Sequence, residues 1–298
     1  TTRSALGIAY SQLSGTMQAH VEGSPVLPMQ IGFNTRAALL AIDLARRGIT
    51  GPSDFLEGPF GYFALVDPDW DPAPFADLGR LWRITELSHK PFPSGRATHG
   101  GVDGALSLQR AHGFRNEDIE AIRVLAPPLV IQLVDRPPSP QMSASYARLC
   151  LPYVAATALL RGTVSVEDFD ATALRDPARH ALAARISVRH DGNPALNALA
   201  PQRVEVDLKS GQACALDLPS VLGAPGRPLG RDRHLAKFRV AAVSGLQPMP
   251  AGRIEALIDQ VDRLEQLADV RALVDLLVFP QPGTSGIPHA TPQRPGQP

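Results

Sequence analysis

The hydrophobic pattern of this chain changes its period near residue 85 and again near residue 232, and these changes constrain the fold most. Before the first change, apolar side chains recur at helical spacing, as in residues 5–20 and 32–47. After it, helical stretches alternate with short runs typical of strands, namely LWRITEL, IEAIRVLA, ARISVRHD, RVEVDLKSG and ACALDLP. Helical spacing returns after the second change. The pattern predicts an α+β region between two helical segments.

Four segments follow from these changes: helical residues 1–84, α+β residues 85–231, helical residues 232–279, and a Pro/Gly-rich tail, 280–298, expected to be disordered. A helical pattern begins within a few residues of Thr1, so we expect the chain to be the remainder of something longer. Gly48 is placed to end a helix and Gly211 to form a hairpin. The pattern further predicts helical stretches at about 53–60, 100–113, 145–161 and 176–184.

The composition excludes several classes of function. The chain has 29 basic and 29 acidic residues, which argues against a nucleic-acid or membrane-surface partner bound by bulk charge. No apolar run approaches the ~20 residues of a membrane span, and a signal-peptide pattern is lacking, so we expect a cytoplasmic protein. Cys150 and Cys214 lie far apart in apolar surroundings and are predicted to be buried free thiols.

The segment His89–His99, HKPFPSGRATH, is the strongest candidate for a functional site. It concentrates Lys90 and Arg96 in a turn stiffened by two prolines, and Thr98 is placed to cap the helix that follows. A cationic turn at a helix N-terminus suits a carboxylate or phosphate. Of these two cations, only the Lys90 amine could also transfer protons, because the arginine guanidinium stays protonated. The alternative is a solvated helix cap without a ligand.

Other motifs are less informative. The glycines of GIAYSQLSG and GITGP do not follow strands with the spacing of a nucleotide-binding loop. His89 and His99 are ten residues apart across two prolines, so we predict no metal site. Ser94 lacks the GxSxG elbow of a nucleophile and is predicted to be a hydrogen-bond donor at most.

Two tyrosines lie on the predicted helix 145–161. Tyr146 and Tyr153 are seven residues apart and would share a face, with Pro152 disturbing the hydrogen-bond ladder between them. A phenol on an otherwise apolar helix either serves a site or makes a hydrogen bond in the core. Both interpretations remain open at this point.

Several motifs in this order resemble those of the MmgE/PrpD family, which contains 2-methylcitrate dehydratases, cis-aconitate decarboxylases and related epimerases. The matching stretches are GIAYSQLSG, GF…RAALLAIDLARRGITGP, LWRITELSHKPFPSGRATHGGVDGAL, LPYVAATALLRGTVSVEDF and LAKFR. The resemblance implies an all-α domain interrupted by an α+β lid, with the active site in the cleft between them. It also implies a homodimer that works without a metal or organic cofactor.

The resemblance assigns roles to individual residues. Lys90 matches the lysine of the family's K-P-x-P turn and would be an acid/base or a carboxylate clamp. Arg96, Thr98 and His99 match the R-x-T-H that follows; Arg96 and Thr98 would hold a carboxylate, with Ser94 adding a hydrogen bond, and His99 would be catalytic. Tyr153 matches the tyrosine of the family's S-x-x-Y helix and would assist proton transfer.

The sequence also departs from the family pattern. Leu27 and Gln30 stand where the family's K-R-x-H-x-G motif has Lys and His, and Gly95 replaces a usual Cys or His. The family's first helices, which carry an Asp and a His of the site, have no counterpart. The chain would then be a fragment, a subunit completed by a partner chain, or a non-catalytic relative.

Taken together, the sequence predicts a lyase that dehydrates or decarboxylates a small di- or tricarboxylate, abstracting a proton next to a carboxylate. The partners expected are that substrate and either a second copy or a chain supplying the missing helices. Two alternatives are an epimerase of the same fold and a non-catalytic binding or scaffolding subunit.

Overall fold

The computed structural model describes residues 1–278. They belong to two compact units, Thr1–Leu229 and a second one that begins at Gly230, and each is described by itself. The predicted disordered tail lies outside the described residues. No helix within residues 1–278 is both long and apolar enough to cross a membrane.

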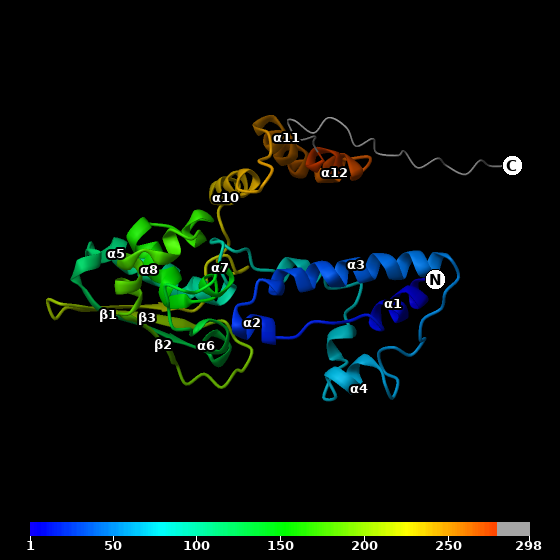
Figure 1. Ribbon diagram of the computed structural model, residues 1–298, viewed down its shortest axis with the longest axis horizontal. Coiled ribbons are helices and arrows are strands. Elements are labelled where there is room, and N and C mark those ends of the chain that lie inside the picture. The colour runs from blue at the N-terminus through cyan, green and yellow to red at the C-terminus, as the bar shows by residue number, and fades with distance from the viewer. Residues whose placement is uncertain (279–298) are drawn as a thin grey trace. The chain divides into compact units, whose positions relative to one another are not determined.

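The first unit contains a four-stranded mixed sheet with α5 (His99–His112) and α8 (Leu151–Arg161) on one side of it (Figure 1). Its strands are β1 (Ile119–Ala126), β2 (Ile186–His190), β3 (Gln202–Leu208) and β4 (Ala213–Leu218), in the spatial order β2-β1-β3-β4. β1 and β2 are parallel, whereas β3 is antiparallel to both β1 and β4. The predicted hairpin between β3 and β4 is confirmed, with Gly211 at a φ of +86°.

The two faces of the sheet differ in polarity because side chains alternate along each strand. On one face Val124 pairs with Val188 and Val204, and all three are buried. On the other face Arg123 donates to Glu205 at 3.1 Å and also pairs with Asp207. Further ion pairs on that face join Arg203 to Glu205 and Asp217. The polar face therefore suits solvent, and the apolar face requires a covering layer.

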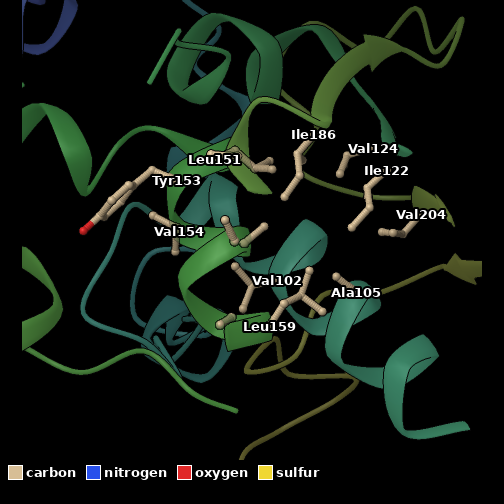
Figure 2. Packing of buried hydrophobic residues seen from close by; sticks show 14 of the residues in the cluster. Val102, Ala105, Ile122, Val124, Leu151, Tyr153, Val154, Leu159, Ile186 and Val204 are labelled. Carbon is tan, nitrogen blue, oxygen red and sulfur yellow. The ribbon is translucent and has the colours of Figure 1, made fainter. Parts of the chain in front are cut away.

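Helices α5 (His99–His112) and α8 (Leu151–Arg161) pack against each other and against the apolar face. Figure 2 shows side chains of both helices, including Val102 and Val154, in the same buried cluster as Ile122 and Val204 of the sheet. Close approach of α5 depends on Gly104, where a β-carbon would lie 2.4 Å from Cγ2 of Val204. α9 (Pro177–Ala183) packs against α8, and α6 (Pro128–Val134) contacts β2. α7 (Ala144–Ala147) contributes Ala147 to the same core.

The N-terminal part of the first unit is helical. α1 (Thr2–Tyr10) packs against α3 (Val26–Arg46) through Ile8, Ala41 and Ala45, while α2 (Gln18–Glu22) and α4 (Tyr62–Val66) are short. Buried Arg136, after α6, donates to Nδ1 of His20 at 3.0 Å and thereby ties α2 to the α+β part.

The second unit consists of α10 (Arg231–Val243), α11 (Ala251–Asp262) and α12 (Arg271–Leu277). Arg239 of α10 forms two hydrogen bonds with Glu255 of α11, at 2.8 and 2.9 Å. Arg253 donates to the carbonyl oxygens of residues 275, 276 and 278, which satisfies the C-terminal end of α12. The helical pattern predicted for this part is confirmed.

Short 3₁₀ turns connect these elements: Ala73–Phe75, Arg83–Glu86, Arg96–Thr98, Asn116–Asp118, Glu167–Phe169, Ala173–Arg175 and Leu264–Gln266. One of them corrects a prediction, because LWRITEL contains the turn Arg83–Glu86 and not a strand. Its apolar residues Trp82 and Ile84 are 70% and 73% exposed, so the sheet does not incorporate this segment. The four other predicted strands are confirmed.

Three predicted helices also need correction. The pattern over 5–20 contains two separate helices, because α1 ends at Tyr10 and α2 begins only at Gln18. Residues 53–60 form turns. The predicted helix 145–161 is split into α7 and α8, since Pro152 occupies the first turn of α8, where its missing N–H is not needed. Tyr146 and Tyr153 therefore do not share a helix face. Both cysteines are buried free thiols, as expected.

Candidate functional site

The segment His89–His99 is fixed to two distant loops by backbone hydrogen bonds. The amide of His89 donates to the carbonyl oxygen of Gly223 at 2.8 Å, in the loop after β4. The amide of Gly95 donates to the carbonyl oxygen of Arg148 at 2.8 Å, in the loop between α7 and α8. With two prolines between these anchors, the turn has little freedom to move.

Burial divides the predicted site residues into two groups. Ser94, Thr98 and His99 are 4%, 0% and 0% exposed, so solvent barely reaches them. Arg96 is half-buried, and Lys90 is exposed at the start of the turn. A ligand arriving from solvent can thus contact Lys90 and Arg96, but not Ser94, Thr98 or His99.

Four side chains of the turn are joined by hydrogen bonds. Nε2 of His99 lies 3.1 Å from Oγ of Ser94, which lies 2.9 Å from Oγ1 of Thr98. The Thr98 hydroxyl donates to the carbonyl oxygen of Gly95 at 2.8 Å. Nδ1 of His99 lies 3.5 Å from Nη1 of Arg96, and the His99 ring meets the Phe92 ring edge-on. The structure thus brings together Ser94, Arg96, Thr98 and His99.

Within residues 1–278, Arg96 and Arg136 each have a buried guanidinium nitrogen without a hydrogen-bond partner. In Arg96 this atom is Nε, and the Nη2 of Arg96 donates to the carbonyl oxygen of Val221 at 3.2 Å. Within residues 1–278 its guanidinium makes no ion pair with an acidic side chain, and burial lowers its pKa. A desolvated cation without a counter-charge is costly, and an anionic ligand would offset that cost.

The start of α5 differs from the prediction. Thr98 occupies the N-cap position, but its hydroxyl donates to Gly95 instead of accepting from an amide of the helix. The reason is the 3₁₀ turn Arg96–Thr98, which runs directly into α5 and uses the amides of Thr98 and His99 for its own bonds to Gly95 and Arg96. The first turn of α5 is also buried, so it presents no open anion site.

Tyr153 lies apart from this cluster. It is fully buried, and its hydroxyl bonds to the carbonyl oxygens of Asp168 at 2.8 Å and Ala173 at 3.0 Å. Figure 2 shows the hydroxyl pointing away from the labelled aliphatic side chains of the core. Burial raises the pKa of the phenol, against the influence of Arg179. The structure gives Tyr153 a hydrogen-bonding role in the core, and its assignment as a catalytic residue stays a prediction.

The sequence analysis missed the buried network around Tyr153. Arg179 donates from Nη2 to Oδ1 of Asp168 at 2.8 Å and from Nη1 toward the Tyr153 hydroxyl at 3.4 Å. Asp168 and Arg179 are 2% and 7% exposed. Neither residue stands in a recognisable motif, although VEDFD and PARHA each place a charge within a helical turn. The sequence analysis missed this pair because Asp168 and Arg179 lie on separate segments, and only the fold brings their opposite charges together.

Two cavities lie elsewhere on the first unit. One of about 530 Å³ is lined by residues that include Arg161, Asp168 and Arg175, and one of about 400 Å³ by residues that include Gln202 and Asp217. Neither cavity is lined by a predicted site residue. Asp168 and Arg179, which form hydrogen bonds with Tyr153, line the first cavity. In the part of the chain that is described, no cluster of His, Cys, Asp and Glu could hold a metal ion.

Comparison with known proteins identifies the family. The model of the MmgE/PrpD C-terminal domain matches residues 92–263, which is more than half of the chain, and the model of the MmgE/PrpD N-terminal domain matches residues 1–74. The chain belongs to the MmgE/PrpD family. The predicted resemblance is thereby confirmed.

Curated relatives of this MmgE/PrpD chain include cis-aconitate decarboxylases. The chain is 28% identical to the Mus musculus enzyme over 289 residues, and 29% identical to the Homo sapiens enzyme over 293 residues. It is 26% identical to the enzyme of Aspergillus terreus (strain NIH 2624 / FGSC A1156) over 299 residues. These alignments cover 93% to 94% of this chain and 57% to 59% of the relatives. The chain thus spans less than two thirds of their length.

The turn His89–His99 presents two cationic side chains, Lys90 and Arg96. Arg96 donates to the Val221 carbonyl oxygen in the loop after β4. Lys90 directly follows His89, whose amide donates to Gly223 in the same loop. The two cations lie on a rigid turn, and Arg96 has no acidic partner in the described residues. Such an arrangement can hold a carboxylate.

Proposed function

We propose that this chain is a lyase, or part of one, that acts on a small di- or tricarboxylate by decarboxylation or dehydration. The observation that carries the proposal is the half-buried Arg96, whose guanidinium has a buried Nε without a partner and forms no ion pair within residues 1–278. The relatives named cis-aconitate decarboxylase support a tricarboxylate as the substrate class and loss of CO2 as the reaction.

The proposed chemistry needs a bound carboxylate and a proton carrier. Arg96 would hold one carboxylate through its Nη atoms, which lie toward Val221 and His99. In decarboxylation the bond from carbon to the leaving CO2 breaks, its electron pair stays on carbon, and a proton is added to that carbon. In dehydration a proton leaves the carbon next to the carboxylate, and hydroxide leaves with a second proton. Lys90 is the exposed amine that could carry these protons.

The test is an NMR time course of the purified chain with cis-aconitate, and separately with a hydroxy-tricarboxylate, in D2O. Formation of a five-carbon unsaturated diacid, or of an alkene from the hydroxy acid, supports a lyase. Deuterium exchange at the α-carbon without an alkene would indicate the alternative epimerase. If neither the spectrum nor the substrate's linewidth changes, the chain does not act on these acids, and the non-catalytic alternative is favoured.

Two variants connect the reaction to the turn. Lys90→Ala and Arg96→Gln are expected to lower kcat/KM by about 10²–10³, because the first removes the proposed proton carrier and the second removes the cation that binds the carboxylate. Matched controls are Lys209→Ala, in the exposed β3–β4 hairpin, and Arg115→Gln, whose side chain is 76% exposed. They change net charge equally but lie outside the turn. Equal activities of site and control variants would refute the assignment.

We also propose that the active form contains a second chain, either another copy or a helical partner, with the α+β part acting as a lid. The support is the apolar surface of α3, on which Ile31, Leu39 and Leu40 are 72%, 62% and 50% exposed. Native mass spectrometry of the protein from its own cell extract measures this directly. A monomer at micromolar concentration would contradict the proposal.

A further inference from the structure

The hydrogen bonds of the turn form a continuous chain with a determinable direction. It runs from the guanidinium of Arg96 through His99, Ser94 and Thr98 to the carbonyl oxygen of Gly95. A carbonyl oxygen only accepts, so the Thr98 hydroxyl must donate its single hydrogen to Gly95. The contact between Ser94 and Thr98 therefore needs the Ser94 hydroxyl as donor.

The same reasoning fixes the tautomer of His99. Because the one hydrogen of Ser94 is used toward Thr98, the contact between Ser94 and Nε2 of His99 needs Nε2–H as donor. At the other side of the ring, Nδ1 faces Nη1 of Arg96, and a guanidinium has donors but no acceptor. Nδ1 must therefore carry the lone pair. Both sides of the ring require the same neutral form, with hydrogen on Nε2.

The ring has little freedom to adopt another arrangement. His99 is 0% exposed, and the edge-on Phe92 ring lies with its centroid 5.5 Å away. A hydrogen on Nδ1 would point at the N–H groups of Arg96, and an imidazolium would place a second positive charge beside the guanidinium. Without exposure, His99 also has no route by which to touch a substrate from solvent.

We infer that His99 is a positioning residue for Arg96: the chain from Gly95 through Thr98 and Ser94 holds its ring in the Nε2–H form, so that Nδ1 and the Val221 carbonyl together orient the guanidinium toward a carboxylate. This inference rests on the proposed function for the nature of the ligand. It replaces the expected catalytic role of His99 by an indirect one, and it gives Thr98 and Ser94 a role that does not need contact with substrate.

The first experiment is ¹⁵N NMR of the full chain labelled on histidine, with the His99 signals assigned by their loss in His99→Gln. At neutral pH the wild type should show the ¹⁵N signature of the Nε2–H tautomer at His99. Thr98→Val keeps the shape of the side chain but removes the hydroxyl, which frees the Ser94 hydroxyl to donate to Nε2. Because Arg96 still faces Nδ1, His99 in this variant should show a detectable fraction of the Nδ1–H tautomer beside the Nε2–H form. Thr98→Ser, the matched control, keeps the hydroxyl and should keep the wild-type signature.

The second experiment measures steady-state kinetics with cis-aconitate. Thr98→Val should raise KM by about tenfold with little change in kcat, because a misaligned Arg96 loses ground-state and transition-state binding equally. Thr98→Ser should stay near the wild type. If Thr98→Val does not fold by circular dichroism, Ser94→Ala takes its place, since it removes the acceptor of Nε2–H and should also release the tautomer.

Two results would overturn the inference. One is a wild-type His99 that carries its hydrogen on Nδ1 or is an imidazolium at neutral pH. The other is a Thr98→Val or Ser94→Ala enzyme with a lower kcat at unchanged KM, which would mean that His99 transfers a proton during the reaction. Failure of the proposed function gives a different result: the Nε2–H signature is present and responds to Thr98→Val, but the wild type neither binds nor converts cis-aconitate.

Discussion

His89 and Gly223 lie in such close contact that only glycine fits at the second position. The amide of His89 donates to the carbonyl oxygen of Gly223 at 2.8 Å, and a β-carbon on Gly223 would lie 1.9 Å from the carbonyl oxygen of His89. Gly223 also has a φ of +92°, a conformation that other residues rarely adopt. The contact fixes the beginning of the cationic turn against the loop that supplies the Val221 carbonyl to Arg96.

Gly223→Ala is therefore expected to destabilise the protein by about 2–4 kcal/mol, since it combines backbone strain with a clash against main-chain atoms. Urea unfolding followed by circular dichroism measures the change. Gly192→Ala is the control, because Gly192 has a φ of +84° but its β-carbon would meet nothing within 4 Å. It should cost only about 1 kcal/mol. Equal losses would show that the His89 contact has no steric consequence.

Asp168→Asn is expected to be strongly destabilising. Asp168 is 2% exposed and accepts from Arg179 at 2.8 Å and from the amide of Ser165 at 2.7 Å. The neutral amide leaves the buried Arg179 with only the more exposed Asp176, 3.3 Å from its Nε, as a counter-charge. Breaking one side of a buried pair costs about 3–5 kcal/mol. Asp217→Asn removes the partner of Arg203 at an exposed site and should change stability little. Comparable losses in the two variants would contradict the prediction.

Tyr153→Phe should lower the free energy of unfolding by about 1–3 kcal/mol, because the carbonyl oxygens of Asp168 and Ala173 lose their buried donor. Tyr146→Phe is the matched control. The Tyr146 hydroxyl donates to the carbonyl oxygen of Pro137 at 3.1 Å in a partly exposed position, so its loss should cost less than about 1 kcal/mol. Thermal unfolding of both variants decides whether the Tyr153 hydroxyl serves the core in this way.

The thiol of Cys150 should make stability depend on pH in the alkaline range. Burial raises its pKa from 9.0 to about 12, with a smaller contribution from Asp135 and opposing ones from Tyr153 and Arg136. Between these values the unfolded chain loses the proton while the folded chain keeps it. The contribution of Cys150 is therefore fully present below pH 9 and is lost as the pH rises toward 12, by up to about 4 kcal/mol.

Cys150→Ser isolates this contribution, because its hydroxyl can still donate to the Arg136 carbonyl but does not ionise in that range. The stability difference between wild type and variant, measured by urea unfolding from pH 8 to pH 11, should shrink or change sign as the pH rises. Groups common to both proteins cancel in the difference. A difference that is constant with pH would rule out a buried, proton-retaining thiol.

Much of the local structure could be predicted from the sequence. Four strands followed from alternation, as in β3, where Val204 and Val206 are buried between half-exposed polar neighbours. The prediction failed where the pattern was ambiguous. LWRITEL has the composition of a strand, but it does not pair with the four-stranded sheet, and its large apolar residues are exposed. Pro152 was read as a disturbance within one helix, yet it begins a new one.

The candidate site was located from the sequence but not resolved by it. The concentration of Lys90, Arg96 and His99 between prolines identified the turn, and the family motif supported that choice. The sequence did not separate exposed Lys90 from buried Thr98 and His99, and it grouped Tyr153 with them. Burial depends on which elements cover a residue, and here the loop after β4 and the loop between α7 and α8 do so.

By itself the sequence determined the features that act over a few residues: helical and alternating periods, the stiffness given by Pro91 and Pro93, and the motif that marks the family. Only the tertiary structure decided which polar groups meet. Arg96 and the Val221 carbonyl are 125 residues apart in the chain, yet they form a hydrogen bond. Such contacts depend on how whole helices, strands and loops pack together, so they cannot be predicted from local hydrophobic patterns.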